Sequence, residues 1–512
     1  MSALSNTKLE VPPSQPPLTA AATLSSPWHR GLPYVLLSLL LLIPCFWHAH
    51  IEAGDLGSHV YNAWLAQLIH QGKAPGLYLV WQWDNVFFDL LLYNLGKFLG
   101  FTAAEKIAVS FCVLVFFWGL FSLMKAASGR APWFFTPCIA MLTYGYIFHM
   151  GFLNYYLSLG LGALGVSLVW SPRKKGLIAA ALLMPFMLFA HPMGLLWFIG
   201  IAGYRFLWLR FSGWWKLLLP AGAPLVFYAA RVYVARHGFE LEWREKPFWT
   251  LNGADELHVF GERYVWFAIT IGLFFLLASA IAFFQQSSRL KFWTDRRLLL
   301  ELYFISFLGS ALLPENLHLD PTGGWVGALA TRLTLSTAML GLCWLASLPQ
   351  RSWHLGLTAV CAIVFFVFLY QDTAFLARME ASARRITQTL PFGTRTVATI
   401  FAPSDYRTIY LHIPDRACIG HCFLISNYEP ATRQFRVRVQ QGSPVASASV
   451  DDTEDMQSGT YDVQDEDLPL KQIYQCNAKD LTQICIRDLS SDEKNGRLGY
   501  HPVDNPFFSQ NP

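Results

Sequence analysis

The chain has 512 residues, of which 54% are hydrophobic, 15% aromatic and only 14% charged. Apolar runs long enough to cross a bilayer recur between residues 32 and 371, which indicates a multi-span membrane protein and excludes an ordinary soluble domain. The formal net charge of +4 is spread between these runs, so the sequence offers no basic face for nucleic acid.

The apolar runs predict a mainly α-helical bundle with about eleven transmembrane spans. When these spans alternate, Lys and Arg gather in the short loops of one side, which the positive-inside rule makes cytoplasmic. Residues 1–30 lack a cleavable signal pattern, so we expect a disordered cytoplasmic head before an uncleaved first span in the cell (inner) membrane. The predicted spans are 32–49, 107–124, 133–149, 152–170, 176–190, 193–209, 216–234, 263–284, 297–314, 329–348 and 353–371.

The loop of residues 50–106 follows the first span and is expected on the outer side. From residue 56 to 69, apolar residues recur at helical spacing, which predicts an amphipathic helix whose other face carries Asp55, His59 and Asn62. The stretch 86–100 is short and interrupted by charged and polar residues, so we expect an interfacial helix here and not a further span. The outer loop is therefore the most organised connection in the first half of the chain.

Asp55 stands directly before the first amphipathic helix, in the stretch His50-Ile-Glu-Ala-Gly-Asp-Leu-Gly-Ser-His59. An Asp in this place commonly caps a helix. A carboxylate at the outer end of a span can also take a proton from an acceptor hydroxyl. The two roles do not exclude each other, and position alone leaves both open.

This order of features resembles the glycosyltransferase C superfamily, which are polytopic membrane enzymes that use polyprenyl-phosphate-linked sugars. The resemblance rests on a first span followed at once by an acidic residue, a long outer loop, many spans and an outer C-terminal domain. It implies that Asp55 is the general base and that Glu52 is a second catalytic candidate. Some members use another acid in the next outer loop, but here that loop reads His149-Met-Gly-Phe-Leu-Asn154.

Arg332 lies at the start of the predicted span 329–348. A buried Arg in an apolar helix costs about 2.5 to 3.5 kcal/mol on insertion scales unless it meets a cavity or a partner. The phosphate of a lipid-linked donor needs a cation near the outer ends of the spans. The alternatives are snorkelling to lipid headgroups or an ion pair with Glu315 or Asp320.

Further polar residues are expected at the same outer level, and we predict that they line one substrate-binding cavity with Asp55. They are His59, His149, Asn154, His191, His318 and Arg332. A single His at a helix end is more often a hydrogen-bonding residue than a catalyst. No cofactor is certain: a divalent metal stays open, although neither an HxxxH nor a DxD spacing supports one.

Residues 373–512 are far more polar than residues 31–372, which hold the predicted transmembrane catalytic module. Runs at 394–401, 407–413 and 434–439 alternate like strands, so we expect a small extracytoplasmic α+β domain. The pairs Cys418 with Cys422 and Cys476 with Cys485 are either disulfides or free thiols in this compartment. The acidic run 451–467 is expected to be a solvated loop.

The sequence therefore predicts a membrane glycosyltransferase of the cell envelope that moves a hexose or pentose from a polyprenyl-phosphate donor to an extracytoplasmic glycan, lipid or protein. A transporter or flippase of a lipid-linked or sugar substrate is the alternative from another class. Transporters commonly carry paired halves and polar residues deep in their spans, whereas here the polar residues gather near one surface. A sensor or assembly factor that acts through the outer tail is a third hypothesis, and it would make Asp55 dispensable.

Overall fold

The computed structural model describes residues 27–171, 173–237, 241–243, 250–286, 288–318, 325–400, 410–432, 434–477 and 479–495. The contacts of the chain define two compact units, residues 1–40 and residues 41–512. The described residues are mainly helical and carry three small sheets. The first 26 residues of the predicted cytoplasmic head lie outside this description.

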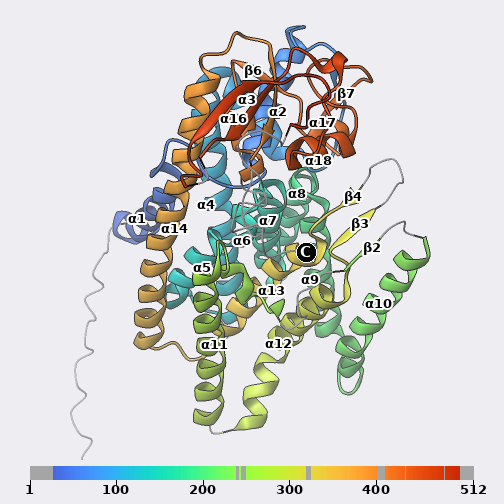
Figure 1. Cartoon of the computed structure of the whole chain (residues 1–512). Helices are drawn as coiled ribbons and strands as arrows, with labels where there is room; N and C mark the ends of the chain where they lie inside the picture. Colours follow the sequence, from blue (N-terminus) through green and yellow to red (C-terminus); the bar gives the residue numbers. More distant parts are fainter. Residues whose placement is uncertain are drawn as a thin grey trace, which may run out of the picture. The chain divides into compact units, whose positions relative to one another are not determined.

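Long apolar helices make up much of residues 41–512 (Figure 1), and every predicted span overlaps a helix. Among the described helices, six are long and apolar enough to cross a membrane. The predicted span 133–149 is broken into three short helices, so it does not form one continuous span. The structure thus supports a membrane protein. Six described helices have the length and hydropathy of a membrane span, whereas the sequence predicted about eleven spans.

The helices outside the loop 50–100 and the C-terminal region follow in chain order. They are α1 (Pro27–Phe46), α4 (Phe101–Ser128), η1 (Trp133–Phe135), α5 (Thr136–Thr143), α6 (Tyr146–His149), α7 (Leu153–Trp170), α8 (Lys174–Ala190), α9 (Pro192–Arg210), α10 (Trp215–His237), η3 (Ala254–Leu257), η4 (Glu262–Tyr264), α11 (Val265–Gln285), α12 (Arg289–Leu312), α13 (Leu329–Ser347) and α14 (Ser352–Thr387). The strands β2 (Leu241–Glu242), β3 (Asn316–His318) and β4 (Trp325–Val326) form an antiparallel sheet in the order β2-β3-β4.

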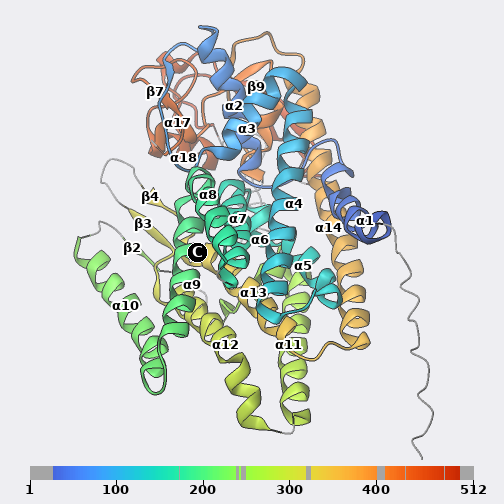
Figure 2. The same cartoon turned by 180° about the vertical axis from the view of Figure 1, so that it is seen from behind.

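Helices α4 and α7 pack closely (Figure 2) because glycines face each other across the contact. A Cβ on Gly119 would lie 2.3 Å from the carbonyl oxygen of Gly160, a distance that no side chain can occupy. This close approach fixes α7, and its N-terminal end carries Asn154 and follows the loop that contacts Asp55.

The outer loop and the polar C-terminal region are joined by backbone pairing. The loop carries α2 (Leu56–His70), β1 (Leu77–Leu79) and α3 (Phe87–Leu99). Strand β1 pairs antiparallel with β7 (Val437–Val439), so that Leu77 faces Val439. Helix α14 runs through residue 372 without a break. The structure therefore joins the predicted outer loop 50–106 to the predicted domain 373–512.

The C-terminal region is an α+β structure around a four-stranded sheet of order β6-β5-β8-β9. Strand β5 (Thr394–Thr399) runs parallel to β6 (Cys422–Leu424) and β8 (Lys471–Gln475), and β9 (Ile484–Asp488) is antiparallel to β8. An apolar core is formed by Val397, Ile425, Met456, Val463, Leu470 and Leu489. The remaining helices are α16 (Ile413–Ala417), α17 (Glu429–Thr432), α18 (Val450–Ser458) and η6 (Asp465–Asp467).

Two local predictions for this region are wrong. Residues 410, 411 and 413 are helical and residue 412 lies in a turn, where a strand over 407–413 was expected; residues 407–409 lie outside the description. The acidic run begins as helix α18, because Ser449 caps its start and Met456 anchors it in the core. Both cysteine pairs, Cys418 with Cys422 and Cys476 with Cys485, are disulfides.

Candidate functional site

The turn that carries Asp55 is held by the loop before α7. The backbone N–H of Gly54 donates to the carbonyl of His149 at 2.7 Å, and that of Asp55 donates to Met150 at 3.1 Å. Gly151 has a φ of +82°, and a Cβ at this position would lie 2.4 Å from the Asp55 nitrogen. Only glycine permits this backbone approach, so the loop of residues 149–154 positions Asp55 although it contains no acid.

The carboxylate of Asp55 is not used as a helix cap. Asp55 occupies the N-cap position of α2, but its side chain accepts no capping hydrogen bond. The side chain is 15% exposed, and its Oδ1 lies 3.6 Å from Nε2 of His412. Of the two roles that the sequence left open, capping is therefore not seen in the structure, and the chemical role stays a hypothesis.

His412 connects Asp55 to a second carboxylate. Its Nδ1 lies 3.3 Å from Oδ2 of Asp415, while Nε2 faces Asp55. Burial lowers the pKa of His412, but the hydrogen bond and charge of Asp415, followed by the charge of Asp55, outweigh burial and raise it. The C-terminal region can approach this closely because a Cβ on Gly57 would lie 2.1 Å from the His412 carbonyl oxygen.

On the other side of α2, His59 is held between two acids. Its Nδ1 lies 2.7 Å from Oδ1 of Asp89 and 3.7 Å from Oε1 of Glu429. Burial disfavours the charged ring, but the charge and hydrogen bond of Asp89 prevail and raise the pKa of His59 to about 10. Asn154 donates from Nδ2 to Oδ2 of Asp89 at 2.9 Å. His59 is thus a fixed cation at neutral pH.

Glu429 is the most deeply buried acid beside His59, and Ser58 donates to it at 2.8 Å. Burial raises the pKa of Glu429 to about 8, against the favourable charge of His59. Burial likewise raises the pKa of Tyr428, and the charge of Asp55 acts in the same direction. Glu429 and Tyr428 therefore keep their protons at neutral pH.

Arg332 lies in the first turn of α13 and reaches the same place. Its guanidinium packs on the Phe152 ring at 4.3 Å from the centroid, and Asp55 is the acid that interacts most strongly with it. Within the described part of the chain Arg332 forms no ion pair, and its buried Nε has no hydrogen-bond partner. Glu315 instead accepts from the Thr331 hydroxyl at 2.6 Å, whereas Asp320 lies outside the description.

The three other predicted histidines differ in their surroundings. His149 is buried against Phe148 and Phe260, and burial lowers its pKa to about 4, so it is neutral at physiological pH. His191 caps α9 by accepting from the Met193 N–H at 3.2 Å and interacts electrostatically with Arg332. His318 ends strand β3, and its side chain lies outside the described part of the structure.

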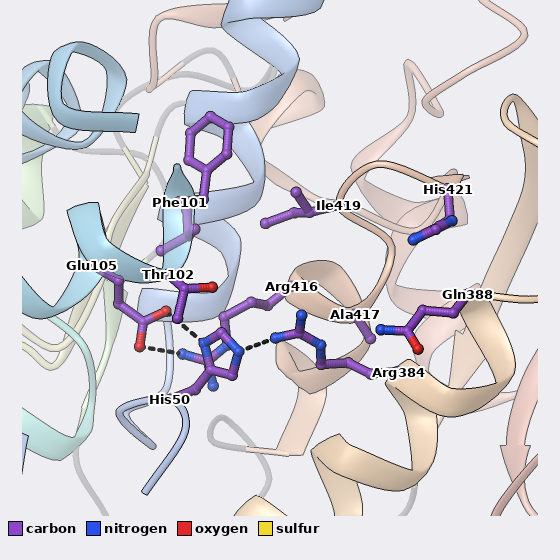
Figure 3. Close-up of a pocket in the computed structure, with 11 residues that line it drawn as sticks. His50, Phe101, Thr102, Glu105, Arg384, Gln388, Arg416, Ala417, Ile419 and His421 are labelled. Carbon is purple, nitrogen blue, oxygen red and sulfur yellow. Dashed lines mark hydrogen bonds and ion pairs between the residues drawn. The ribbon is translucent and has the colours of Figure 1, made fainter. Parts of the chain in front are cut away.

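Glu52 belongs to a separate group, which we name the Arg416 cluster. The Arg416 guanidinium lies 3.2 Å from both Glu52 Oε2 and Glu105 Oε1, and it also pairs with Glu380. Burial raises the pKa of Glu52 well above its ordinary range, and repulsion from Glu380 adds to this effect. His50, which lies 3.1 Å from Glu105, is the fifth member of the cluster, and Figure 3 shows it with Arg416 and Glu105. The ion pair with Arg416 gives Glu52 a structural role, which explains its position.

The second group, which we name the Asp55 cluster, contains four of the residues predicted from the sequence and five that were missed. Its members are Asp55, His59, Asn154, Arg332, Asp89, His412, Asp415, Tyr428 and Glu429. Asp89 had been interpreted as an interruption of an apolar stretch, and the other four come from the domain in which no catalytic pattern was visible. Among the described residues, no group of His, Cys, Asp and Glu has an arrangement that could hold a metal ion.

Comparisons with known proteins give no match to a family model, to a curated protein or to a solved structure.

Proposed function

We propose that this protein is an integral membrane glycosyltransferase that uses a polyprenyl-phosphate sugar, with Asp55 as its general base. The observation that carries the proposal is the pair formed by Asp55 and Arg332. A partly exposed carboxylate without a capping role lies near a half-buried guanidinium that has no ion pair among the described residues. A buried cation of this kind is costly unless an anion is present for part of the working cycle.

The pair matches the two charges that glycosyl transfer must handle. Asp55 takes the proton of the acceptor hydroxyl while that oxygen forms a bond to the anomeric carbon of the sugar. The bond between the anomeric carbon and the phosphate oxygen breaks, and its electron pair leaves with the phosphate. Arg332 stabilises the charge that develops on this phosphate. The donor's lipid chain stays in the bilayer, which explains a cation at the start of a membrane helix.

His412 and Asp415 support this role of Asp55. A base is most effective when its lone pair is held toward the reacting proton, and His412 fixes one oxygen of Asp55 while Asp415 fixes His412. The raised pKa of His412 favours its protonated form, which places a positive charge beside Asp55. We therefore assign His412 as a positioning residue for the base.

In the proposed topology the N-terminus is cytoplasmic, and the Asp55 cluster opens to the extracytoplasmic side, where a glycan, lipid or protein acceptor is met. The C-terminal region contributes directly to the site through His412 and Glu429. A transporter would not require a base held at the surface by two further titratable groups. The proposed function therefore accounts for more of the cluster than transport does.

The test is transfer of label from a panel of radiolabelled polyprenyl-phosphate hexoses and pentoses in membranes that contain the full-length chain. Asp55→Asn keeps the size of the side chain but removes the base, so we expect transfer to fall by about 10²- to 10⁴-fold while insertion and expression are unchanged. Asp84→Asn makes the same chemical change elsewhere in the outer loop and should transfer normally. Full transfer by the Asp55→Asn protein would exclude the proposed base.

A further inference from the structure

A second polar cavity lies beside the Arg416 cluster, on the surface of the extracytoplasmic region. It has a volume of about 130 Å³ and is bordered by residues of α2 and the turn before it, the start of α4, the end of α14, and α16 with the segment after it. Its polar lining consists of His50, Thr102, Glu105, Arg384, Gln388, Arg416 and His421, which Figure 3 shows around a common space. Because a water molecule takes about 30 Å³, the cavity has room for a group as large as a phosphate.

Glu105, the one acid in this lining, is already satisfied. Its Oε2 accepts from His50 at 3.1 Å, while its Oε1 accepts from the Ile51 N–H at 2.7 Å and lies 3.2 Å from Arg416. It is fully buried, so its charge is neutralised within the Arg416 cluster and does not face the cavity as a free anion. The remaining polar groups of the lining are donors or can act as donors.

Arg384 is the cation with unused hydrogen-bonding capacity. Its guanidinium donates to Nε2 of His50. Because a guanidinium has no acceptor atom, Nε2 must be unprotonated, and the His50 hydrogen therefore sits on Nδ1, which faces Glu105. Among the described residues Arg384 has no carboxylate partner, so its other N–H groups are available to a ligand.

The start of α4 adds to the positive character of the cavity. Helix α4 has 28 residues, its first turn has no acidic residue, and Gly100 at its N-cap offers no side-chain acceptor. Phe101 and Thr102 of this first turn line the cavity. The free N–H groups and the dipole of the helix therefore favour an anion at the place where Arg384 already provides a charge.

We propose that this cavity is a binding site for a phosphate group, held by Arg384, Gln388 and Thr102. Two sources share this chemistry: a free phosphoryl group and the headgroup of an anionic phospholipid. The site lies outside the Asp55 cluster and does not depend on the proposed transferase activity. It would let the protein bind a phosphoryl group or a phospholipid headgroup at a place other than the Asp55 cluster.

The experiment measures thermal unfolding of the full-length detergent-solubilised protein during titration with inorganic phosphate at constant ionic strength. A parallel titration uses short-chain phosphatidylglycerol against short-chain phosphatidylcholine. We expect Arg384→Gln to weaken the response about tenfold or more, since it removes a charge-assisted hydrogen bond. Arg385→Gln is the matched control, because it removes an exposed Arg from the adjacent position outside the cavity lining.

Gln388→Glu is the second variant. It keeps the proposal testable if Arg384→Gln fails to fold. Gln388 is exposed, so the isosteric change should leave folding intact while placing a negative charge at the cavity. Stabilisation by inorganic phosphate that both variants lose supports a free phosphoryl ligand. Stabilisation by phosphatidylglycerol alone, lost in both variants, supports a lipid headgroup. No response of the parent protein to either probe, or an equal response in Gln388→Glu, overturns the site.

Discussion

The Arg416 cluster and the Asp55 cluster flank the same short turn, but they use their charges differently. In the Arg416 cluster, one cation meets three carboxylates, and all four side chains are at most 3% exposed. In the Asp55 cluster, the central acid is 15% exposed, and Nε of Arg332 has no hydrogen-bond partner among the described residues. Buried ion pairs between Arg416 and three carboxylates hold two regions of the chain together, whereas a guanidinium without an ion pair among the described residues leaves Arg332 able to bind an anionic ligand.

The largest expected effect on stability is in the Arg416 cluster. Arg416→Met would leave buried carboxylates without their cation, so we expect a loss of about 3 to 5 kcal/mol in the free energy of unfolding. Thermal unfolding of the purified protein measures this loss. Arg385→Met, at an exposed position, should change stability little. Comparable stabilities of the two variants would contradict a structural role for the cluster.

Asp55→Asn should give the opposite result, with a large loss of transfer and little loss of stability. The carboxylate makes no capping bond, so we expect the free energy of unfolding to change by less than about 1 kcal/mol. The transfer assay and thermal unfolding on the same preparation separate the two effects. A variant that unfolds readily would place Asp55 with the structural residues.

Arg332→Gln should weaken the apparent affinity for the lipid-linked donor by about 10- to 100-fold, the effect of losing a charge-assisted contact with phosphate. Arg332→Lys keeps the charge but loses the planar donor geometry, and it should fall between the parent and Arg332→Gln. Donor titrations of the transfer rate measure both. Unchanged donor dependence in the two variants would remove Arg332 from the site.

His59 offers a smaller, pH-dependent test. Its ordinary pKa of 6.5 applies to the unfolded chain, and the fold raises it to about 10. The stabilisation from the charged ring is therefore complete below pH 6.5 and is lost as the pH rises toward 10. We expect the melting temperature to decline over this interval in the parent protein and to decline less in His59→Asn. Parallel curves would show that Asp89 does not stabilise a charged His59.

The sequence predicted the helical class, the small sheet of the C-terminal region and several residues of the Asp55 cluster. Apolar runs and helical spacing are local signals, and they located α2 and α3. Asp55 was recognisable because it stands directly between a span and an amphipathic helix. These features depend on neighbours in the chain, which is why they could be read without a structure.

The partners of Asp55 could not be read in this way. His412 and Asp415 lie at the start of α16, in a segment that was interpreted partly as a strand. Nothing near them in the sequence indicates that they lie beside Asp55. Their role arises from the contact between α2 and α16, which a glycine at position 57 permits. The break in the predicted span 133–149 could not be predicted for a related reason, because a hydrophobic run does not reveal where its helix is interrupted.

The distance along the chain between the two halves of the site has a consequence for biosynthesis. Ser58 and Glu429 form a hydrogen bond across 371 residues of sequence. At about 5 to 20 residues per second, a ribosome needs roughly 20 to 75 s to pass from one to the other. Until the C-terminal region has been synthesised, β1 therefore has no β7 to pair with, and the Asp55 cluster lacks the residues that this region contributes.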